Sequence, residues 1–356
     1  MSDYQNIKVK KLENSEMEIE GEISVEKVEA HIDEAMRRLG EDVAMPGFRK
    51  GHVPPKILKQ RLGEMAVWTE AAEYALRAEY PTILKAALEK VKDAEPISAP
   101  EVTITKMAPG NPLGFKMRIA LMPEVKLPDY KKIARERTKD KGQRTKDLEV
   151  TDKEVEELMT NLQKARAGHE KVIKNKSNDH DNDSNLPVFN DEFARSLGSF
   201  KDVEDFKKKA RENLLEEKKM RAKEELRFGI IDAIVSETKV SLPEVLIEGE
   251  LQQMFAQFEG DITRAGFSMV DYMKRANKTE EDLKKEWRGA AEKRAKTQLA
   301  LHAIAEAEKL EPEKEKVEES VARMMAQYKD ADERRARAYI TSVLLNEKVF
   351  EFLEAL

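Results

Sequence analysis

The residues whose types and spacing are best suited to binding chemistry form one short run, Gly47-Phe48-Arg49-Lys50-Gly51-His52-Val53-Pro54-Pro55. Glycine lets the backbone turn and proline restricts it, so this run predicts a shaped loop that holds Phe48 and Arg49 outward. Five Lys or Arg residues and no acidic residue lie between Pro46 and Gly63, although the whole chain has a net charge of −6. An exposed aromatic ring flanked by cations suits an RNA-rich or otherwise anionic partner, through phosphate attraction and stacking. The residues alone leave a second interpretation open, a tight turn whose phenylalanine folds back into the core.

Catalytic and metal-binding patterns are absent from the sequence. The chain has no cysteine, no Walker-type phosphate loop and no serine in a Gly-x-Ser-x-Gly elbow. Its five histidines form no His-x-x-x-His or Glu-x-x-His pair; they are His31, His52, His169, His180 and His302. His180 stands between two aspartates in a polar stretch, where a solvated linker is expected rather than a metal site. The sequence therefore predicts no catalytic residue, no metal ligand, no cofactor and no enzyme activity.

The composition predicts a helical protein with a high ratio of surface to volume. Of the 356 residues, 38% are charged, 6% are aromatic and 40% are apolar, and the mean hydropathy is −0.68. This length allows two or three domains, and periodic apolar residues argue against disorder throughout. Residues 1–20 contain no apolar core of a secretion signal, and no apolar window approaches a membrane span. We therefore expect a cytoplasmic protein without a membrane partner.

The first 121 residues predict a compact α+β domain. Apolar residues alternate over residues 5–24 and again over 102–121, where Pro109 to Pro112 mark a turn, so each stretch predicts a hairpin. Between the hairpins, one-sided apolar stripes predict a helix over 25–39, a short helix around 57–62 and a longer one over 64–92. The expected order is two strands, helices, then two strands.

Residues 122–173 predict a linker and a first arm helix. Residues 122–128 contain two prolines and are expected to be extended. Residues 131–147 are charged and lack a sustained apolar face, so a linker or solvated strand is predicted there. Thr151 and Glu154 have the spacing of a capping box, which predicts a helix start. Residues 174–185 contain no apolar side chain and form the clearest linker in the chain.

Residues 186–356 predict an elongated, mainly helical body with arm-like helices. Apolar stripes recur at helical spacing, and a second capping box is expected at Ser241 to Glu244. Fifteen methionines are a generous number, and flexible thioethers suit surfaces that accept many partners. The candidates for such a surface are Met254, Phe258, Met269, Met273, Met324 and Met325. Stripes of this kind pack in the core of most proteins, so both roles remain open.

The motif Gly-Phe-Arg-x-Gly-x-x-Pro at residues 47–54 resembles the ribosome-binding signature of the trigger factor family of bacterial chaperones. The stretches 122–127, 186–194 and 240–247 are similar to further segments of that family and occur in its order. The resemblance implies an ATP-independent chaperone that docks near the ribosomal exit tunnel and shields nascent chains. Its partners would be the large ribosomal subunit, through protein and rRNA, and unfolded nascent polypeptides. The implied ribosome-binding residues are Gly47, Phe48, Arg49, Lys50, Gly51 and Pro54.

The chain departs from the family at one place. The family usually inserts a prolyl-isomerase domain, which needs on the order of 100 residues, where this chain has only the polar linker 174–185. The resemblance therefore implies a form that lacks this domain and its activity, with segments 1–121, 122–173, 174–185 and 186–356. A holding chaperone or assembly factor that works without ribosomes is the alternative, and a general RNA-binding role is disfavoured by a pI of about 5.7. Client range and homodimerisation of the free protein are left open.

Overall fold

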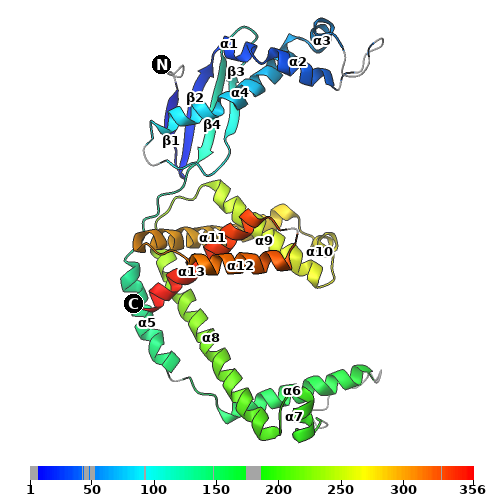
Figure 1. Cartoon of the computed structure of the whole chain (residues 1–356), viewed down its shortest axis with the longest axis vertical. Coiled ribbons are helices and arrows are strands. Elements are labelled where there is room, and N and C mark those ends of the chain that lie inside the picture. The colour runs from blue at the N-terminus through cyan, green and yellow to red at the C-terminus, as the bar shows by residue number, and fades with distance from the viewer. Residues whose placement is uncertain are drawn as a thin grey trace. The chain divides into compact units, whose positions relative to one another are not determined.

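The computed structural model describes residues 7–41, 43, 48, 53–91, 94–146, 148–173, 186–329 and 331–356. The chain divides into two compact units. The first contains Met1–Lys126 and Lys239–Leu299, and the second contains Leu127–Thr238 and Ala300–Leu356. A small sheet-containing N-terminal region is followed by a mainly helical body (Figure 1), so the predicted fold class is confirmed. The four-segment division and the linker 174–185 remain predictions, and that linker and His180 lie outside the described residues.

Both predicted hairpins are present in the first unit. The strands are β1 (Lys8–Lys11), β2 (Glu16–Ile23), β3 (Glu101–Lys106) and β4 (Leu113–Ala120). In the described part of the chain they form one antiparallel sheet in the order β1-β2-β4-β3. The two hairpins join through β2 and β4, with Met17 opposite Ile119 and Ile19 opposite Met117.

The sheet has one apolar and one charged face because successive side chains of a strand alternate. The apolar face is buried on the central strands β2 and β4 and packs against α4 (Glu64–Leu88), as the ribbon in Figure 1 also indicates. On the other face, Lys116 Nζ lies 2.7 Å from Glu20 Oε1 and 3.3 Å from Glu18 Oε1. These ion pairs join β4 to β2, so the register that buries the apolar residues also pairs the charges.

Three shorter helices complete the N-terminal region: α1 (Val25–Glu29), α2 (Ile32–Glu41) and α3 (Pro55–Leu62). The prediction of a single helix over 25–39 was wrong. The chain tightens between α1 and α2, where the His31 N–H donates to the Val28 carbonyl at 3.1 Å. This bond spans three residues rather than four and ends α1 before α2 begins.

The helical part of the first unit contains α9 (Glu244–Arg264), α10 (Met269–Ala276) and α11 (Glu280–Glu308), which continues into the second unit. The predicted capping box at Ser241 to Glu244 was wrong, because α9 begins after Pro243 and has no side-chain cap. The two carboxylate oxygens of Glu244 instead accept hydrogen bonds from Arg288, each at 2.6 Å. A bidentate pair with a guanidinium is stronger than a capping hydrogen bond, so Glu244 pairs with Arg288 rather than capping α9.

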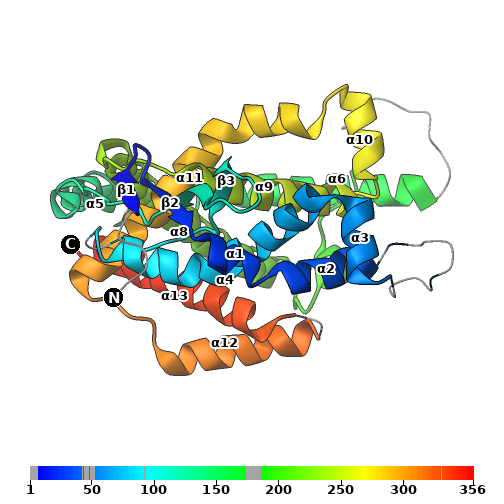
Figure 2. The same ribbon diagram turned by 90° about the horizontal axis from the view of Figure 1, so that it is seen from above.

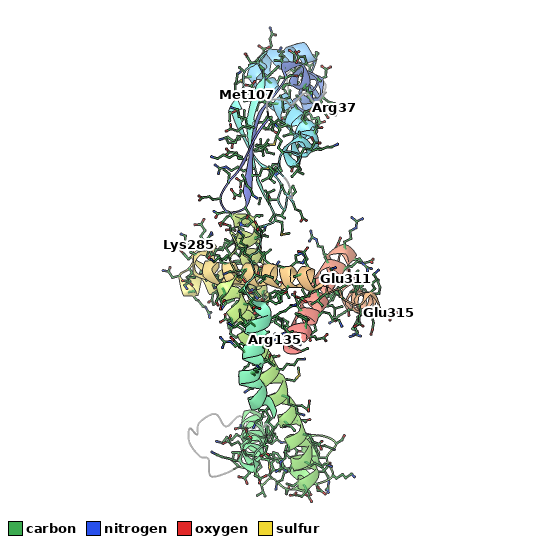
Figure 3. The ribbon with its side chains drawn as sticks, turned by 90° about the vertical axis from the view of Figure 1, so that its left-hand side faces the viewer. Arg37, Met107, Arg135, Lys285, Glu311 and Glu315 are labelled. Atoms are coloured by element: carbon green, nitrogen blue, oxygen red, sulfur yellow. The ribbon has the colours of Figure 1, made fainter. Side chains whose placement is uncertain are left out.

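The core of the second unit is built around α8 (Val203–Glu237). Ile230 and Ile234 of α8 are fully buried against α5 (Tyr130–Lys146), the end of α11 and α13 (Glu333–Glu354). The prediction of a linker or solvated strand over 131–147 was therefore wrong. Figure 3 shows α5 running beside α8, with Arg135 of α5 labelled. Ala134 is fully buried in this contact, and Tyr130 and Ile133 of α5 pack on the same core.

The second unit also contains α6 (Asp152–Ile173) and α7 (Asp191–Leu197). The predicted capping box before α6 is confirmed, since the Thr151 N–H donates to Glu154 Oε2 at 2.8 Å and the Glu154 N–H donates to Thr151 Oγ1 at 3.4 Å. Lys218 Nζ of α8 lies 2.6 Å from Glu154 Oε1. The start of α6 is thus tied to the middle of α8.

The last two helices, α12 (Lys314–Gln327) and α13, lie side by side in Figures 1 and 2. Arg337 of α13 pairs with Glu318 of α12, and Lys348 Nζ lies 2.9 Å from Glu313 Oε1. The outer faces of the helices carry exposed charged side chains, such as Lys285 of α11 and Glu315 of α12 in Figure 3.

Ile230→Ala should destabilise the protein because it leaves a cavity at the centre of the α5–α8–α11–α13 core. We expect a loss of about 2–5 kcal/mol in the free energy of unfolding, measured by urea denaturation with circular dichroism. Met220→Ala on the same helix is the matched control, since Met220 is 58% exposed, and should change stability by less than about 0.5 kcal/mol. Equal effects of the two substitutions would contradict this description of the core.

The contacts of Glu154 with Lys218 and Thr151 predict that the stability of the protein depends on pH. The hydrogen bond from Lys218 and that from the Thr151 N–H lower the pKa of Glu154 from 4.5 to about 2. The pair therefore contributes its full stabilisation above pH 4.5, and the contribution is lost as the pH falls from 4.5 towards 2. NMR titration of the side-chain carboxyl should give a midpoint near 2.

Glu154→Gln keeps the shape of the capping box and removes the charge. Its difference in stability from the original protein should shrink as the pH falls through this window. Glu157→Gln is the control, because the Glu157 carboxylate lies 3.9 Å from Lys153 in a more exposed pair. A titration midpoint of about 4.5 for Glu154 would refute the predicted stabilisation of its carboxylate by Lys218 and Thr151.

Candidate functional site

Of the six predicted ribosome-binding residues in the basic loop, the structure describes two, Phe48 and Pro54. The other four, Gly47, Arg49, Lys50 and Gly51, lie outside the described residues. Phe48 is 37% exposed, so it does not fold back into the core. The Pro54 carbonyl accepts hydrogen bonds from the Ile57 and Leu58 N–H groups, both at 3.0 Å, and thereby starts α3. The loop thus ends at a fixed point and carries an exposed aromatic ring.

The end of the loop is anchored by a small apolar cluster. Val53 is 8% exposed and packs with Leu58 of α3, Val67 of α4 and Met36 of α2. One of the basic residues of the run is neutralised by an acid beyond it, since Lys59 Nζ lies 2.9 Å from Glu64 Oε1. Sequence reasoning missed this pair because Glu64 follows the glycine that closes the run.

Two of the six predicted client-contact residues meet in one hollow. Met254 and Phe258 of α9 and Trp287 of α11 line a space of about 210 Å³. The Phe258 ring makes edge contacts with Trp287 at 5.3 Å and with Tyr272 of α10 at 5.1 Å between ring centroids. Met254 and Phe258 are half-buried, so they contribute to packing and still present an apolar surface.

Met269 and Met273 lie on α10 and are also half-buried. Two apolar neighbours that sequence reasoning missed are far more exposed, Phe267 at 53% and Val270 at 62%. Phe267 gave no periodic signal because it lies in the connection before α10, where the Ser268 hydroxyl accepts from the Asp271 N–H at 3.1 Å.

Met324 and Met325 lie on α12 in the second unit and are half-buried. The neighbouring helix α13 exposes Tyr339 and Val343, which are 61% and 45% accessible. The spacing of four residues between these two is a helical signal that would have found them. Val349 and Leu353 supply the buried face of α13.

Several titratable side chains with shifted pKa values lie in contacts between helices, which indicates a structural role for these groups. Burial and the hydrogen bond to Glu308 raise the pKa of Tyr130 to about 12, and these two residues join α5 to α11. The hydrogen bonds that Arg227 donates to Glu347 and Glu354 raise the pKa of Arg227 and join α8 to α13. Among the described residues, no three metal-ligating side chains gather, and no helix is long and apolar enough to span a membrane.

Two models of one protein family match this chain. The bacterial trigger factor protein model covers residues 5–162, and the model of the bacterial trigger factor C-terminus covers residues 202–354. The trigger factor of Moorella thermoacetica is 27% identical over 428 aligned positions, covering 97% of this chain and 93% of the relative. That of Halalkalibacterium halodurans is 27% identical over 400 positions, covering 90% of each.

A solved structure of the trigger factor chaperone, reported for promiscuous substrate recognition in folding and assembly, has the same fold. It covers 98% of this chain and 99% of its own, with 18% identity and a TM-score of 0.50. Between the two family models only residues 163–201 remain, which is too short for a domain of about 100 residues. The chain therefore belongs to the trigger factor family, in a form that lacks the prolyl-isomerase domain.

Proposed function

We propose that this protein is an ATP-independent chaperone that docks beside the ribosomal exit tunnel and shields nascent chains through weak apolar contacts. The observation that carries the proposal is the exposed Phe48 in a loop with the family's ribosome-binding motif. The cytoplasm is the expected location, where ribosomes and unfolded chains meet.

Docking uses the loop as a shaped anchor. Phe48 inserts into a groove of the partner, since exposed aromatic anchors dominate many interfaces. Arg49 and Lys50 pair with rRNA phosphates or an acidic protein patch, and Gly47 and Gly51 allow the loop its shape. Pro54 supports this role because its carbonyl fixes the start of α3 directly behind the loop.

Shielding uses apolar surface that the fold leaves half-covered. Met254 and Phe258 border a hollow of about 210 Å³, and Met324 and Met325 present a second half-buried group. Flexible thioethers adapt to different client side chains, and contacts that are individually weak allow release without nucleotide hydrolysis. The promiscuous recognition reported for the solved trigger factor supports this reading of the same fold.

Replacement of the loop side chains should abolish docking. Phe48→Ala/Arg49→Ala/Lys50→Ala should bind ribosomes at least about tenfold more weakly in co-sedimentation, because it removes one aromatic anchor and two cations. Binding by the original protein should weaken as salt rises from low to moderate concentration.

The matched control is Phe267→Ala/Lys274→Ala/Arg275→Ala, which removes the same residue types around α10. It should pellet with the large subunit as the original protein does. If the loop variant pellets equally well, or if the original protein stays in the supernatant, a holding chaperone that works without this docking becomes the better account.

Replacement of the α9 surface should weaken client holding without affecting docking. Met254→Ala/Phe258→Ala is expected to bind an unfolded model protein about twofold to fivefold more weakly, a small effect because the contacts are distributed. The measurement is suppression of aggregation after dilution from denaturant. Val188→Ala/Met220→Ala removes two residues that are 78% and 58% exposed outside this surface, and should match the original protein. Equal loss in both variants would remove the α9 hollow from the proposal.

We also propose that the chain has no prolyl-isomerase activity. The refolding of a protein limited by proline isomerisation should proceed at the uncatalysed rate, with a time constant of about 10–100 s at 25 °C, when this chain is added. A concentration-dependent acceleration would contradict the proposal and would require an isomerase site elsewhere on the chain.

A further inference from the structure

The antiparallel sheet of the first unit has two edges, β1 and β3, because its strand order is β1-β2-β4-β3. The outer side of an edge strand carries backbone N–H and C=O groups that no neighbouring strand pairs, so such a strand is a template for a further strand. Among the described residues, neither edge has a backbone partner outside the sheet. The docking and client holding proposed above use neither edge.

The β1 edge is protected against pairing with a copy of itself. Three of its four residues are lysines, Lys8, Lys10 and Lys11, and it contains no acidic residue. An antiparallel pair of such strands would set lysine against lysine, and like charges opposite each other are destabilising. Lysine-rich edges of this kind are a common means by which natural sheets avoid association.

The β3 edge is complementary in charge to a copy of itself. Its six residues read Glu-Val-Thr-Ile-Thr-Lys, with Glu101 at one end and Lys106 at the other. In an antiparallel pair of two such strands, the acidic end of each lies beside the basic end of the other, which is favourable. All of these residues except Ile104 are exposed, and Val102 is 44% exposed although it lies on the apolar face of the sheet. A second strand would cover it.

The alternation of side chains fixes how two β3 strands would pair. Residues that lie opposite each other in an antiparallel pair point to the same face of the sheet. Val102 and Ile104 lie on the apolar face, and Thr103 lies on the charged face, opposite Lys116 of β4. A two-fold axis through Thr103 therefore sets this residue against its own copy. The same axis sets Val102 of each strand against Ile104 of the other.

A β-bulge brings Lys106 to the face on which Glu101 lies. The register of β3 on β4 shifts between Ile104 and Lys106, so that Lys106 lies opposite Gly114. Lys106 Nζ then lies 3.6 Å from Glu22 Oε1 on the charged face. Both of these side chains are more than half exposed, so the pair is weak and the ammonium group stays accessible to a second carboxylate.

We propose that β3 pairs with β3 of a second copy of this chain, so that two four-stranded sheets join edge to edge. The pair is antiparallel and centred on Thr103, and Glu101 of each copy lies beside Lys106 of the other. The bulge ends the regular ladder after Ile104, so the contact buries less than the roughly 1,600 Å² of a standard interface and the dimer is weak and reversible. This inference does not rest on ribosome docking or client holding.

The test uses the full chain, which has no cysteine, so that an introduced thiol is unique. Thr103→Cys should form a disulfide-linked dimer under mild oxidation, because Cα atoms directly opposite each other lie about 4.5–5.5 Å apart, within the range that a disulfide spans. Thr105→Cys is the matched control, since Thr105 is also exposed but lies two residues from the axis. Its two copies would be more than about 10 Å apart, so its cross-linking should be at least about tenfold slower.

Charge substitutions in the Thr103→Cys protein test the ends of the pair. Glu101→Lys sets lysine beside lysine and should slow cross-linking about threefold to tenfold. Glu101→Lys/Lys106→Glu exchanges the two charges and should restore most of the original rate. Lys8→Glu makes the same kind of change on the β1 edge and should leave the rate unaltered. Circular dichroism of each variant should match that of the original protein, because every substituted residue is exposed.

Three results would overturn the inference: equal rates for Thr103→Cys and Thr105→Cys, no dimer from either, or a rate that does not respond to Glu101→Lys. Failure of the charge exchange to restore the rate would also count against it, because the complementarity of the two ends would then play no part. In each of these cases the β3 edge would be left to a strand of another protein.

Discussion

The second unit depends on the burial of one apolar stripe at the C-terminal end of α8. Ile230 and Ile234 are fully buried there, and α5, α11 and α13 each contribute a buried partner: Ala134, Ile304 and Val349. The preceding turns of α8 are mostly charged, and a helix of this kind gains little stability from its own hydrogen bonds in water. The stripe therefore fixes four helices together, and the Arg227 pairs with Glu347 and Glu354 set the register of α13 beside it. Because this core already holds the four helices together, the remaining helices can leave some of their apolar side chains exposed.

A high charge content permits that exposure. Most ion pairs of the described helices are at the surface, where each contributes little to stability. Surface charge of this density favours solubility while apolar patches stay exposed. Phe258 illustrates the balance. Its contacts with Trp287 and Tyr272 hold the ring in place, yet the ring is only half-buried and borders an open hollow. A ring held in this way is ordered without any partner, so it would lose little entropy in a further contact.

Local patterns predicted the elements that local contacts determine. The alternation around Met17 and Ile119 was sufficient for the hairpins, and the Thr151 capping box was sufficient for the start of α6. The errors came from distant partners. Glu244 accepts hydrogen bonds from Arg288, 44 residues away, instead of capping α9. The helix α5 packs on α8 through the buried Ala134. At the candidate site the loop motif identified Phe48. The packing of Val53 on Val67 behind the loop was not predicted, because these residues are 14 positions apart in sequence and meet only in the fold. No local pattern carries that information.

The region between α6 and α8 shows how the fold closes without an inserted domain. Phe189, Phe193 and Phe206 form an aromatic cluster with centroid distances of 4.7 and 5.0 Å, and Leu158 and Leu162 of α6 pack on it. Gln163 Nε2 donates to the Pro187 carbonyl at 2.7 Å, which joins α6 to the chain before α7. These contacts come from residues on either side of 174–185, an interval that lies within the stretch 163–201 between the two family models. The ends of α6 and α8 that meet α7 are therefore held together by an apolar core of their own.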